Sequence, residues 1–270
     1  MRGKPHGRAI RAPVLKALCS KTNIGYMAKL SVNLNKIALL RNSRGRDFPN
    51  VIDFANKLIT LGVQGITVHP RQDERHITKK DTLELGKLLS GNPGVEFNIE
   101  GFPSKDFMGL VTKIKPTQCT LVPDTPQQLT SDHGWDLEKD GDLIQDACSQ
   151  LGEHSIRSAL FMDPTPSQLK LVPHAGASRI ELYTEEYAST FNKPEHETVF
   201  ERYKESVLIA QSLGLGVNAG HDLDSINLSK FLTIQGILEV SIGHVLIVEC
   251  IERGMKNVIH QYLSICNASE

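Results

Sequence analysis

Short, nearly continuous apolar runs rich in β-branched residues alternate along the chain with longer helical stretches. Continuous apolar character is typical of parallel strands that are covered by helices outside and packed side chains inside. Eight such pairs begin at Lys29. The predicted strands are residues 29–34, 65–69, 95–100, 118–122, 156–162, 179–183, 216–219 and 239–242. The predicted helices are residues 49–61, 79–89, 104–114, 142–151, 165–174, 196–213, 228–234 and 244–253.

This order of elements predicts an α/β fold built from repeated βα units around a parallel sheet. Neither a low-complexity segment nor a Gly/Ser-rich or Pro-rich linker divides the chain, so eight units in one domain predict a closed (β/α)8 TIM barrel over residues 28–270. The alternative is an open doubly wound sheet. Its Gly-x-Gly-x-x-Gly loop is missing after the first predicted strand, which favours the barrel.

Composition places the chain among ordinary folded proteins, with 40% hydrophobic and 23% charged residues. No apolar run approaches the roughly 18 residues that a membrane span needs, and the mean hydropathy is -0.22. The net charge of -1 gives no indication of a nucleic-acid partner. The five cysteines are widely spaced and never form Cys-x-x-Cys, which argues against a disulfide framework or a zinc ribbon and favours the reducing cytoplasm.

Charge is unevenly distributed at the start of the chain. Residues 1–27 carry six Lys and Arg residues, whereas the first acidic residue is Asp47. The segment has no apolar region of the kind that a secretory signal needs, although its composition is compatible with an organellar transit peptide. We interpret residues 1–27 as a short basic extension of the barrel, disordered or an upstream start-site artefact, that carries no chemistry.

Polar residues gather where the predicted strands end, which is where barrels of this kind carry their active sites. Glycines precede histidines at Gly220-His221 and Gly243-His244, after the seventh and eighth strands, where barrels commonly hold phosphate. Arg44, Arg71 and Arg75 are expected on the same rim, and guanidinium groups suit phosphate. The sequence therefore predicts phosphorylated ligands, with enough cationic groups for two phosphates.

Three side chains at predicted strand ends are suited to proton transfer, namely His69, Glu100 and His221. Histidine titrates near neutrality, and a carboxylate in a partly closed site can be raised toward the same range. A metal centre is the alternative, because His76 and His244 could add further ligands. No His-x-His or His-Glu-x-x-His pair fixes two ligands locally, so we expect no metal.

Four motifs make the chain recognisable as similar to a known family. They are Ser-Val-Asn-Leu-Asn-Lys-Ile-Ala-Leu-Leu-Arg-Asn-Ser-Arg-Gly at 31–45, Gly-Ile-Thr-Val-His-Pro-Arg at 65–71 with Glu-Arg-His-Ile-Thr at 74–78, Val-Asn-Ala-Gly-His at 217–221, and Ile-Gly-His at 242–244. In order and spacing they resemble the pyridoxine 5′-phosphate synthase family. The likeness runs from about Ala28 to the C-terminus.

The resemblance implies an enzyme without metal or cofactor that condenses 1-deoxy-D-xylulose 5-phosphate with 3-amino-2-oxopropyl phosphate. The products would be pyridoxine 5′-phosphate, phosphate and water. On the family pattern His69 and Glu100 accept protons and His221 donates one. The resemblance also implies a homo-octamer. The residues that the family pattern assigns to substrate binding are Asn33, Arg44, Gly243 and His244 for the amino-ketone and Arg71, His76 and Thr130 for the deoxyxylulose phosphate.

The chain departs from the commonest family pattern at two places, both counted here among the substrate-binding residues. Asn35-Lys36 stands in the loop after the first strand where many members have Asp-His, and Asp222 stands where glycine is common. Lys36 can still bind phosphate as a point charge. Two alternatives stay open: a barrel aldolase that forms a Schiff base on Lys36, and a catalytically silent protein that binds phosphorylated ligands.

Overall fold

The computed structural model describes residues 27–124, 128 and 130–268. Eight parallel strands close into a barrel in the order β1 to β8, which confirms the predicted fold. The basic extension lies outside the described residues, apart from Met27. The strands are β1 Lys29–Asn33, β2 Gly65–Val68, β3 Glu96–Gly101, β4 Gln118–Leu121, β5 Arg157–Met162, β6 Arg179–Tyr183, β7 Gly216–Gly220 and β8 Ile237–Ile242.

The closure of the barrel is seen at β1, which pairs with a neighbour on each side. Ser31 is level with Gly65 of β2 and with Ser241 of β8. Position 65 requires glycine, because a Cβ there would lie 2.7 Å from Ser31 Oγ. Since every pair is parallel, all eight carboxyl ends reach the same end of the barrel.

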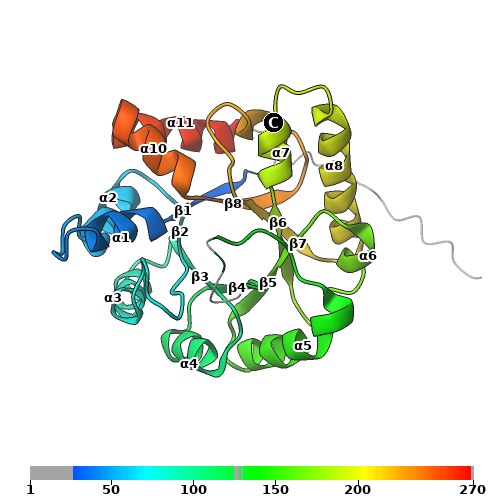
Figure 1. Ribbon diagram of the computed structural model, residues 1–270, viewed down its shortest axis with the longest axis horizontal. Helices are drawn as coiled ribbons and strands as arrows, with labels where there is room; N and C mark the ends of the chain where they lie inside the picture. The colour runs from blue at the N-terminus through cyan, green and yellow to red at the C-terminus, as the bar shows by residue number, and fades with distance from the viewer. Residues whose placement is uncertain (1–26, 125–127, 129, 269–270) are drawn as a thin grey trace, which may run out of the picture.

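Helices form a ring around the strands (Figure 1). They are α1 Asn35–Asn42, α2 Val51–Thr60, α3 Lys79–Ser90, α4 Lys105–Ile114, α5 Leu137–Glu153, α6 Pro166–Leu169, α7 Glu185–Thr190, α8 His196–Ser212, α9 Leu228–Phe231, α10 His244–Arg253 and α11 Met255–Asn267. All eight predicted strands and most of the predicted helices agree with the structure within about two residues, as pattern reading allows. The helices α1, α7 and α11 were not predicted, and α5 begins five residues earlier than expected.

Side-chain caps explain where several helices begin. Thr78 and Asp81 form a reciprocal capping box at the start of α3. The side chains of Asn50 and Ser104 accept hydrogen bonds from the amides of Asp53 and Phe107 at the starts of α2 and α4. Each cap satisfies amides that otherwise lack a partner in the first helical turn.

The expectation of a loop at Asn35-Lys36 was wrong. The helix α1 begins at Asn35, one residue after Leu34 and two after the end of β1. Leu34 stands at the N-cap and cannot cap the helix with its side chain; instead Asn33 Oδ1 accepts from the amide of Asn35 at 2.9 Å. Pattern reading missed the helix because it lacks the usual cap. Asn35 and Lys36 are thereby fixed in a helical turn at the end of β1.

The interior of the barrel contains a buried polar layer. Asn218 of β7 donates from Nδ2 to Gln118 Oε1 of β4 across the barrel at 3.1 Å, and Gln118 donates to Glu239 of β8 at 3.4 Å. Burial, with a further contribution from the charge of Glu96, raises the pKa of Glu239 to about 7. Barrel interiors are mostly filled by branched apolar side chains, so this layer holds titratable groups where a packed apolar core is usual.

None of the helices within the described residues is long and apolar enough to cross a membrane.

Candidate active site

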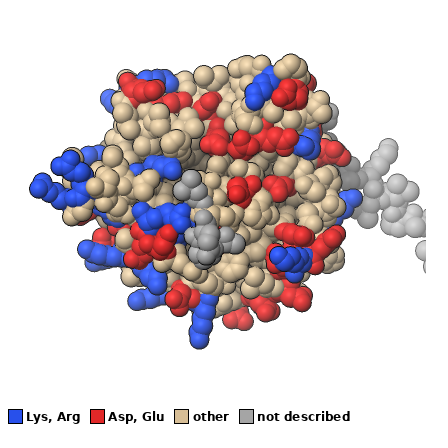
Figure 2. Space-filling view, viewed as in Figure 1, with Lys and Arg blue, Asp and Glu red and all other residues tan. Residues whose placement is uncertain are grey.

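The carboxyl ends of β1, β2, β3, β7 and β8 bring most of the predicted site residues to one end of the barrel. On the face shown in Figure 2, Lys and Arg side chains gather over the side that carries α1 to α3, while Asp and Glu side chains gather near α7. The positive electrostatic potential on this side attracts anionic ligands toward α1, α2 and α3.

His69 and Glu100 lie together at the ends of β2 and β3. His69 Nδ1 is 4.0 Å from Glu100 Oε2, and its Nε2 is 3.9 Å from Asp124 Oδ2. Asn33 donates from Nδ2 to the same oxygen of Glu100 at 3.3 Å. The backbone of His69 is held by Asn35, whose Oδ1 accepts from the His69 amide at 2.9 Å. Asn35 therefore acts between α1 and β2 and fixes the start of the loop that carries His69.

Burial moves the two pKa values in opposite directions. Desolvation, followed by the charges of Glu181, Asp124 and Glu239, raises the pKa of Glu100 well above its ordinary value. Desolvation, together with the charges of Arg71 and His76, lowers the pKa of His69 well below its ordinary value. Burial therefore favours the protonated, neutral form of Glu100 and the unprotonated, neutral form of His69.

Glu181 of β6 is a candidate functional residue that the sequence analysis missed. It is buried inside the barrel, where Thr120 Oγ1 donates to Glu181 Oε2 at 3.2 Å. Burial and the charge of Glu239 raise its pKa to about 8. Gly220 leaves room for it, because a Cβ at that position would lie 2.4 Å from Glu181 Oε1. The available signal was a carboxylate in the middle of β6, between the apolar residues Ile180 and Leu182.

His221 and Asp222 form a pair in the turn after β7. His221 Nδ1 is 2.8 Å from Asp222 Oδ2. The ring of Tyr183 meets the His221 ring edge to face, with the centroids 5.0 Å apart. Both His221 and Asp222 have left-handed backbones, with φ of 87° and 58°. Such conformations are uncommon outside glycine and cost about 1–3 kcal/mol each, so the surrounding contacts must hold this turn.

Further basic side chains lie near this turn and near the end of β2, namely Lys36, His76 and His244. The charges of His244 and Lys36 act on Asp222, and the charge of Lys36 acts on His76. Burial and the charge of Arg71 lower the pKa of His76 to about 4. Its Nδ1 accepts from the amide of Ile77 at 2.9 Å, which assigns the proton of the neutral ring to Nε2. His76 is therefore a neutral donor through Nε2.

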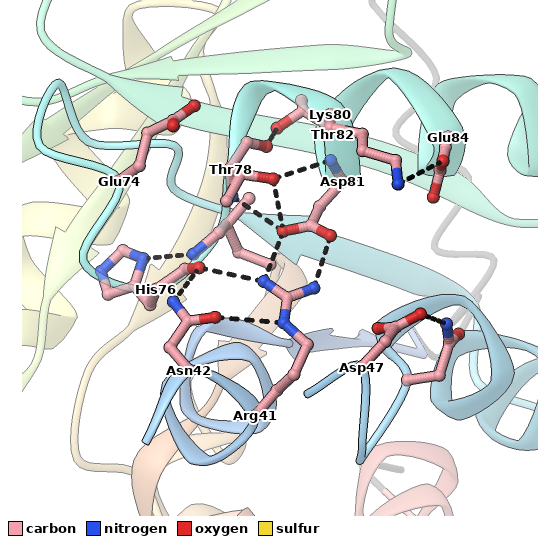
Figure 3. A network of polar contacts seen from close by, with 12 residues as sticks. Arg41, Asn42, Asp47, Glu74, His76, Thr78, Lys80, Asp81, Thr82 and Glu84 are labelled. Atoms are coloured by element: carbon pink, nitrogen blue, oxygen red, sulfur yellow. Dashed lines mark hydrogen bonds and ion pairs between the residues drawn. The ribbon is translucent and has the colours of Figure 1, made fainter. Parts of the chain in front are cut away.

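A polar network around Arg41 fixes the segment that carries His76 (Figure 3). Arg41 of α1 donates two hydrogen bonds to Asp81 of α3, and Asn42 donates from Nδ2 to the carbonyl oxygen of His76 at 2.8 Å. Asp81 also accepts from the amide and the hydroxyl of Thr78. The position of His76 thus depends on contacts between α1 and α3.

Arg71 lies beside a pocket of about 180 Å³ at the end of β2, which His69, Arg75, Phe102 and Asp124 also line. The Arg71 guanidinium is paired with the Asp124 carboxylate and donates to the carbonyl oxygen of Gln128 at 2.8 Å. Burial raises the pKa of Asp124 in spite of this partner. Asp124 was not predicted as a site residue; its only sequence signal was a carboxylate three residues beyond β4.

The two Gly-His turns are not alike. Gly243 immediately precedes α10, and a Cβ at Gly243 would lie 3.0 Å from Asn33 Cβ, so glycine permits a close approach between β8 and β1. The amides at the start of α10 therefore open beside Asn33, as a phosphate cradle requires. After Gly220, by contrast, the next helix begins only at Leu228 and has four residues. A helix therefore begins directly after Gly243, as predicted, whereas none begins directly after Gly220.

Arg44 and Thr130 are two predicted binding residues that lie exposed on the surface. Arg44 is exposed in the turn after α1, and Thr130 is exposed in the segment between β4 and α5. Among the residues that the structure describes, neither side chain forms a hydrogen bond or ion pair with His69, Glu100 or His221. The same described residues contain no group of three or more His, Cys, Asp or Glu placed to hold a metal ion.

Comparison with protein families matches residues 30–268 to the family described as "Pyridoxal phosphate biosynthesis protein PdxJ". A "Pyridoxine 5'-phosphate synthase" from Christiangramia forsetii is 46% identical over 240 residues, which cover 88% of this chain and 99% of that protein. A protein of the same name from Bacteroides thetaiotaomicron is 45% identical over 237 residues, which cover 87% of this chain and 98% of that protein.

Solved structures with the same architecture are more distant in sequence. Tryptophan synthase from M. tuberculosis matches with a TM-score of 0.62 at 13% identity, covering 90% of this chain and 94% of that one. Phosphoribosyl anthranilate isomerase from Thermotoga maritima matches with a TM-score of 0.57 at 11% identity, covering 89% and 98%. At these identities the likeness concerns the barrel fold alone.

Proposed function

The chain belongs to the PdxJ family of pyridoxal phosphate biosynthesis proteins, and from this premise we propose which reaction its site performs. The proposed reaction condenses 1-deoxy-D-xylulose 5-phosphate with 3-amino-2-oxopropyl phosphate into pyridoxine 5′-phosphate, phosphate and water. The observation that carries the proposal is the meeting of His69 with Glu100 at the barrel mouth, with pKa values moved in opposite directions. Pairs of this kind divide acid and base work between two groups.

Ring formation from an amine and two ketones needs protons to be moved at several carbons, so one acid or base is insufficient. In the proposed site, neutral His69 is ready to accept a proton at neutral pH. Burial favours the protonated form of Glu100, which becomes an acceptor after it has released its proton, and a bound cationic amine and Arg71 would favour that release. His221 supplies a proton from the opposite side of the mouth, held by Asp222.

Two separate sets of groups support binding of two phosphorylated substrates. The amides at the start of α10, with Gly243, His244 and Asn33, form one set, to which Lys36 adds a charge from α1. Arg71 and His76 form the other set beside the pocket at the end of β2. The Asp124 carboxylate is paired with the Arg71 guanidinium at the place where the proposed phosphate would bind. Arg44 and Thr130 are proposed to join these sets on the family pattern alone.

The test is the incubation of purified protein, dialysed against a metal chelator, with both substrates. Pyridoxine 5′-phosphate, detected by mass spectrometry, is expected with the native chain and is expected to fall at least about 100-fold with His221→Ala, as loss of a positioned proton donor predicts. His174→Ala is the matched control, because His174 lies in a turn away from the barrel mouth, and it should retain activity. Absence of the product with the native chain would contradict the proposal.

The family pattern also leads us to propose a cytoplasmic homo-octamer. Its support in the structure is the exposure of large apolar side chains on the surface, among them Phe48 at 80% and Ile251 at 74%. Such side chains would become buried if they lie in a contact between subunits. Light scattering coupled to size-exclusion chromatography is expected to give eight times the 29.9 kDa mass of the chain, and a monomer would contradict the octamer.

A further inference from the structure

The turn after β7 places a carboxylate against a histidine in an unusual backbone conformation. His221 and Asp222 are consecutive and both have positive φ, of 87° and 58°. In an extended strand, adjacent side chains point to opposite faces; here Asp222 Oδ2 instead reaches His221 Nδ1 at 2.8 Å. The left-handed turn is what permits this contact between neighbours.

Three hydrogen bonds hold the turn in this conformation. The Thr184 hydroxyl donates a shared hydrogen bond to the carbonyl oxygens of Gly220 and His221, at 2.7 and 2.5 Å. Asn227 donates from Nδ2 to the carbonyl oxygen of Asp222 at 3.3 Å. These hydrogen bonds fix the backbone on both sides of His221 and Asp222. Strained conformations persist at functional sites when the surrounding contacts hold them in this way.

The surroundings keep Asp222 ionised. The hydrogen bond from His221, and then the charges of His221, His244 and Lys36, lower the pKa of Asp222 against the opposing effect of burial. These groups come from three directions, since Lys36 lies on α1 and His244 opens α10. An ionised carboxylate accepts hydrogen bonds and donates none. The proton between the two side chains must therefore be on Nδ1 of His221.

The geometry points to Asp222 as a positioning residue for proton transfer by His221: we propose that it keeps a proton on Nδ1, so that the imidazolium gives its Nε2 proton to the substrate and is left as the neutral Nδ1–H form. The Tyr183 ring, edge to face with His221, restricts the ring plane from β6. This inference rests on the proposed function, in which His221 donates a proton. It gives Asp222 a role through His221 instead of a contact with a substrate.

The first part of the test measures the tautomer directly and needs no substrate. The chain is labelled with ¹⁵N-histidine, and the His221 signals are assigned by their loss in His221→Gln. At alkaline pH the native protein is expected to show a protonated Nδ1 and an unprotonated Nε2. Asp222→Asn and Asp222→Gly are expected to move this balance toward the other tautomer. The same balance in the native chain and in both variants would overturn the proposal.

The second part compares rates. Both asparagine and glycine adopt a left-handed backbone readily, so a purely structural role for Asp222 predicts little change in either variant. The proposed role predicts a fall in kcat of about 10- to 1000-fold with little change in KM, since a wrong histidine tautomer disables proton transfer. A raised KM with unchanged kcat would overturn it by showing that Asp222 contacts a substrate. Melting temperatures of the variants check that they are folded.

Two controls make the assignment specific. Asp224→Asn changes a neighbouring carboxylate that accepts from the amides of Ile226 and Asn227, and it should leave rate and tautomer unchanged. The double variant His221→Ala with Asp222→Asn should be no slower than His221→Ala alone, because Asp222 acts only through His221. A further loss in the double variant would overturn the proposal. If the native chain forms no product, the proposed function fails, while the tautomer measurement still decides the role of Asp222.

Discussion

Arg41 of α1 donates two hydrogen bonds to Asp81 of α3, one to each carboxylate oxygen, at 2.5 and 2.8 Å. Both side chains are buried, with 11% and 9% of their surface exposed. Asp81 also completes the capping box of α3 with the N-cap residue Thr78, and Arg41 and Asn42 contact the carbonyl oxygen of His76. This ion pair thus joins α1 to α3 and supports the capping box of α3. It also fixes the position of His76, a predicted phosphate-binding residue.

We predict that Asp81→Asn destabilises the protein by about 3–5 kcal/mol, because it leaves the buried Arg41 charge without its partner. Denaturant unfolding monitored by circular dichroism measures the change. The matched control is Lys80→Ala in the same helix, where the pair with Glu84 is exposed and 3.8 Å long; its loss should cost below about 0.5 kcal/mol. Equal effects of the two substitutions would contradict the structural role of the buried pair.

A second prediction concerns the pH dependence of the reaction. Glu100 must be ionised to accept a proton, and its raised pKa means that this form appears only as the pH rises. The value of kcat/KM, which reports the free enzyme, should therefore increase with pH on its acidic limb. Glu181→Gln removes a neighbouring charge that raises the pKa of Glu100, so the limb should move to lower pH whatever the absolute rate. A limb that stays in place would show that Glu100 does not control it.

A third prediction concerns stability and Glu239, whose pKa of about 7 in the folded protein lies above its ordinary value of 4.5. An acid with a raised pKa stabilises the fold most below its unfolded pKa, and that contribution is lost as the pH rises toward the folded pKa. Glu239→Gln should remove about 1–3 kcal/mol of the fall in unfolding free energy between pH 5 and pH 7 or so. The measurement is urea unfolding at several pH values. An unchanged slope would indicate that Glu239 is ionised throughout.

The fourth prediction decides between two uses of Lys36. If Lys36 only contributes charge beside Asp222 and His76, borohydride reduction in the presence of 1-deoxy-D-xylulose 5-phosphate leaves it unmodified. Lys36→Arg should then retain most activity, since the charge is kept. Peptide mass spectrometry after reduction makes the measurement. An adduct on Lys36 would instead support the Schiff-base aldolase that the sequence leaves open.

The strand ends could be predicted from the sequence because parallel strands in a barrel all bring their carboxyl ends to one side. This rule was enough to bring His69, Glu100 and His221 to the barrel mouth, where the structure has them. The same rule did not identify Glu181, because this residue lies in the middle of β6 and points into the barrel. Its role depends on Thr120 and Gly220, which are far away in the sequence.

The local backbone geometry of the site also could not be predicted from the sequence. The helix α1 begins without a capping side chain at Leu34, so no cap signalled that Asn35 and Lys36 are helical. The contact between His221 and Asp222 depends on positive φ at two residues other than glycine, which composition does not reveal. The pairing of Arg71 with Asp124 joins segments 53 residues apart, and only the closed barrel brings them together.

In the proposed reaction, this barrel mouth joins two phosphorylated substrates into one pyridine ring. The most direct test of this reaction is a time course in which pyridoxine 5′-phosphate and inorganic phosphate are measured together, with each substrate alone as the control. Both products are expected to appear at equal rates and only when both substrates are present. Phosphate released from a single substrate, or consumption of both substrates without pyridoxine 5′-phosphate, would contradict it.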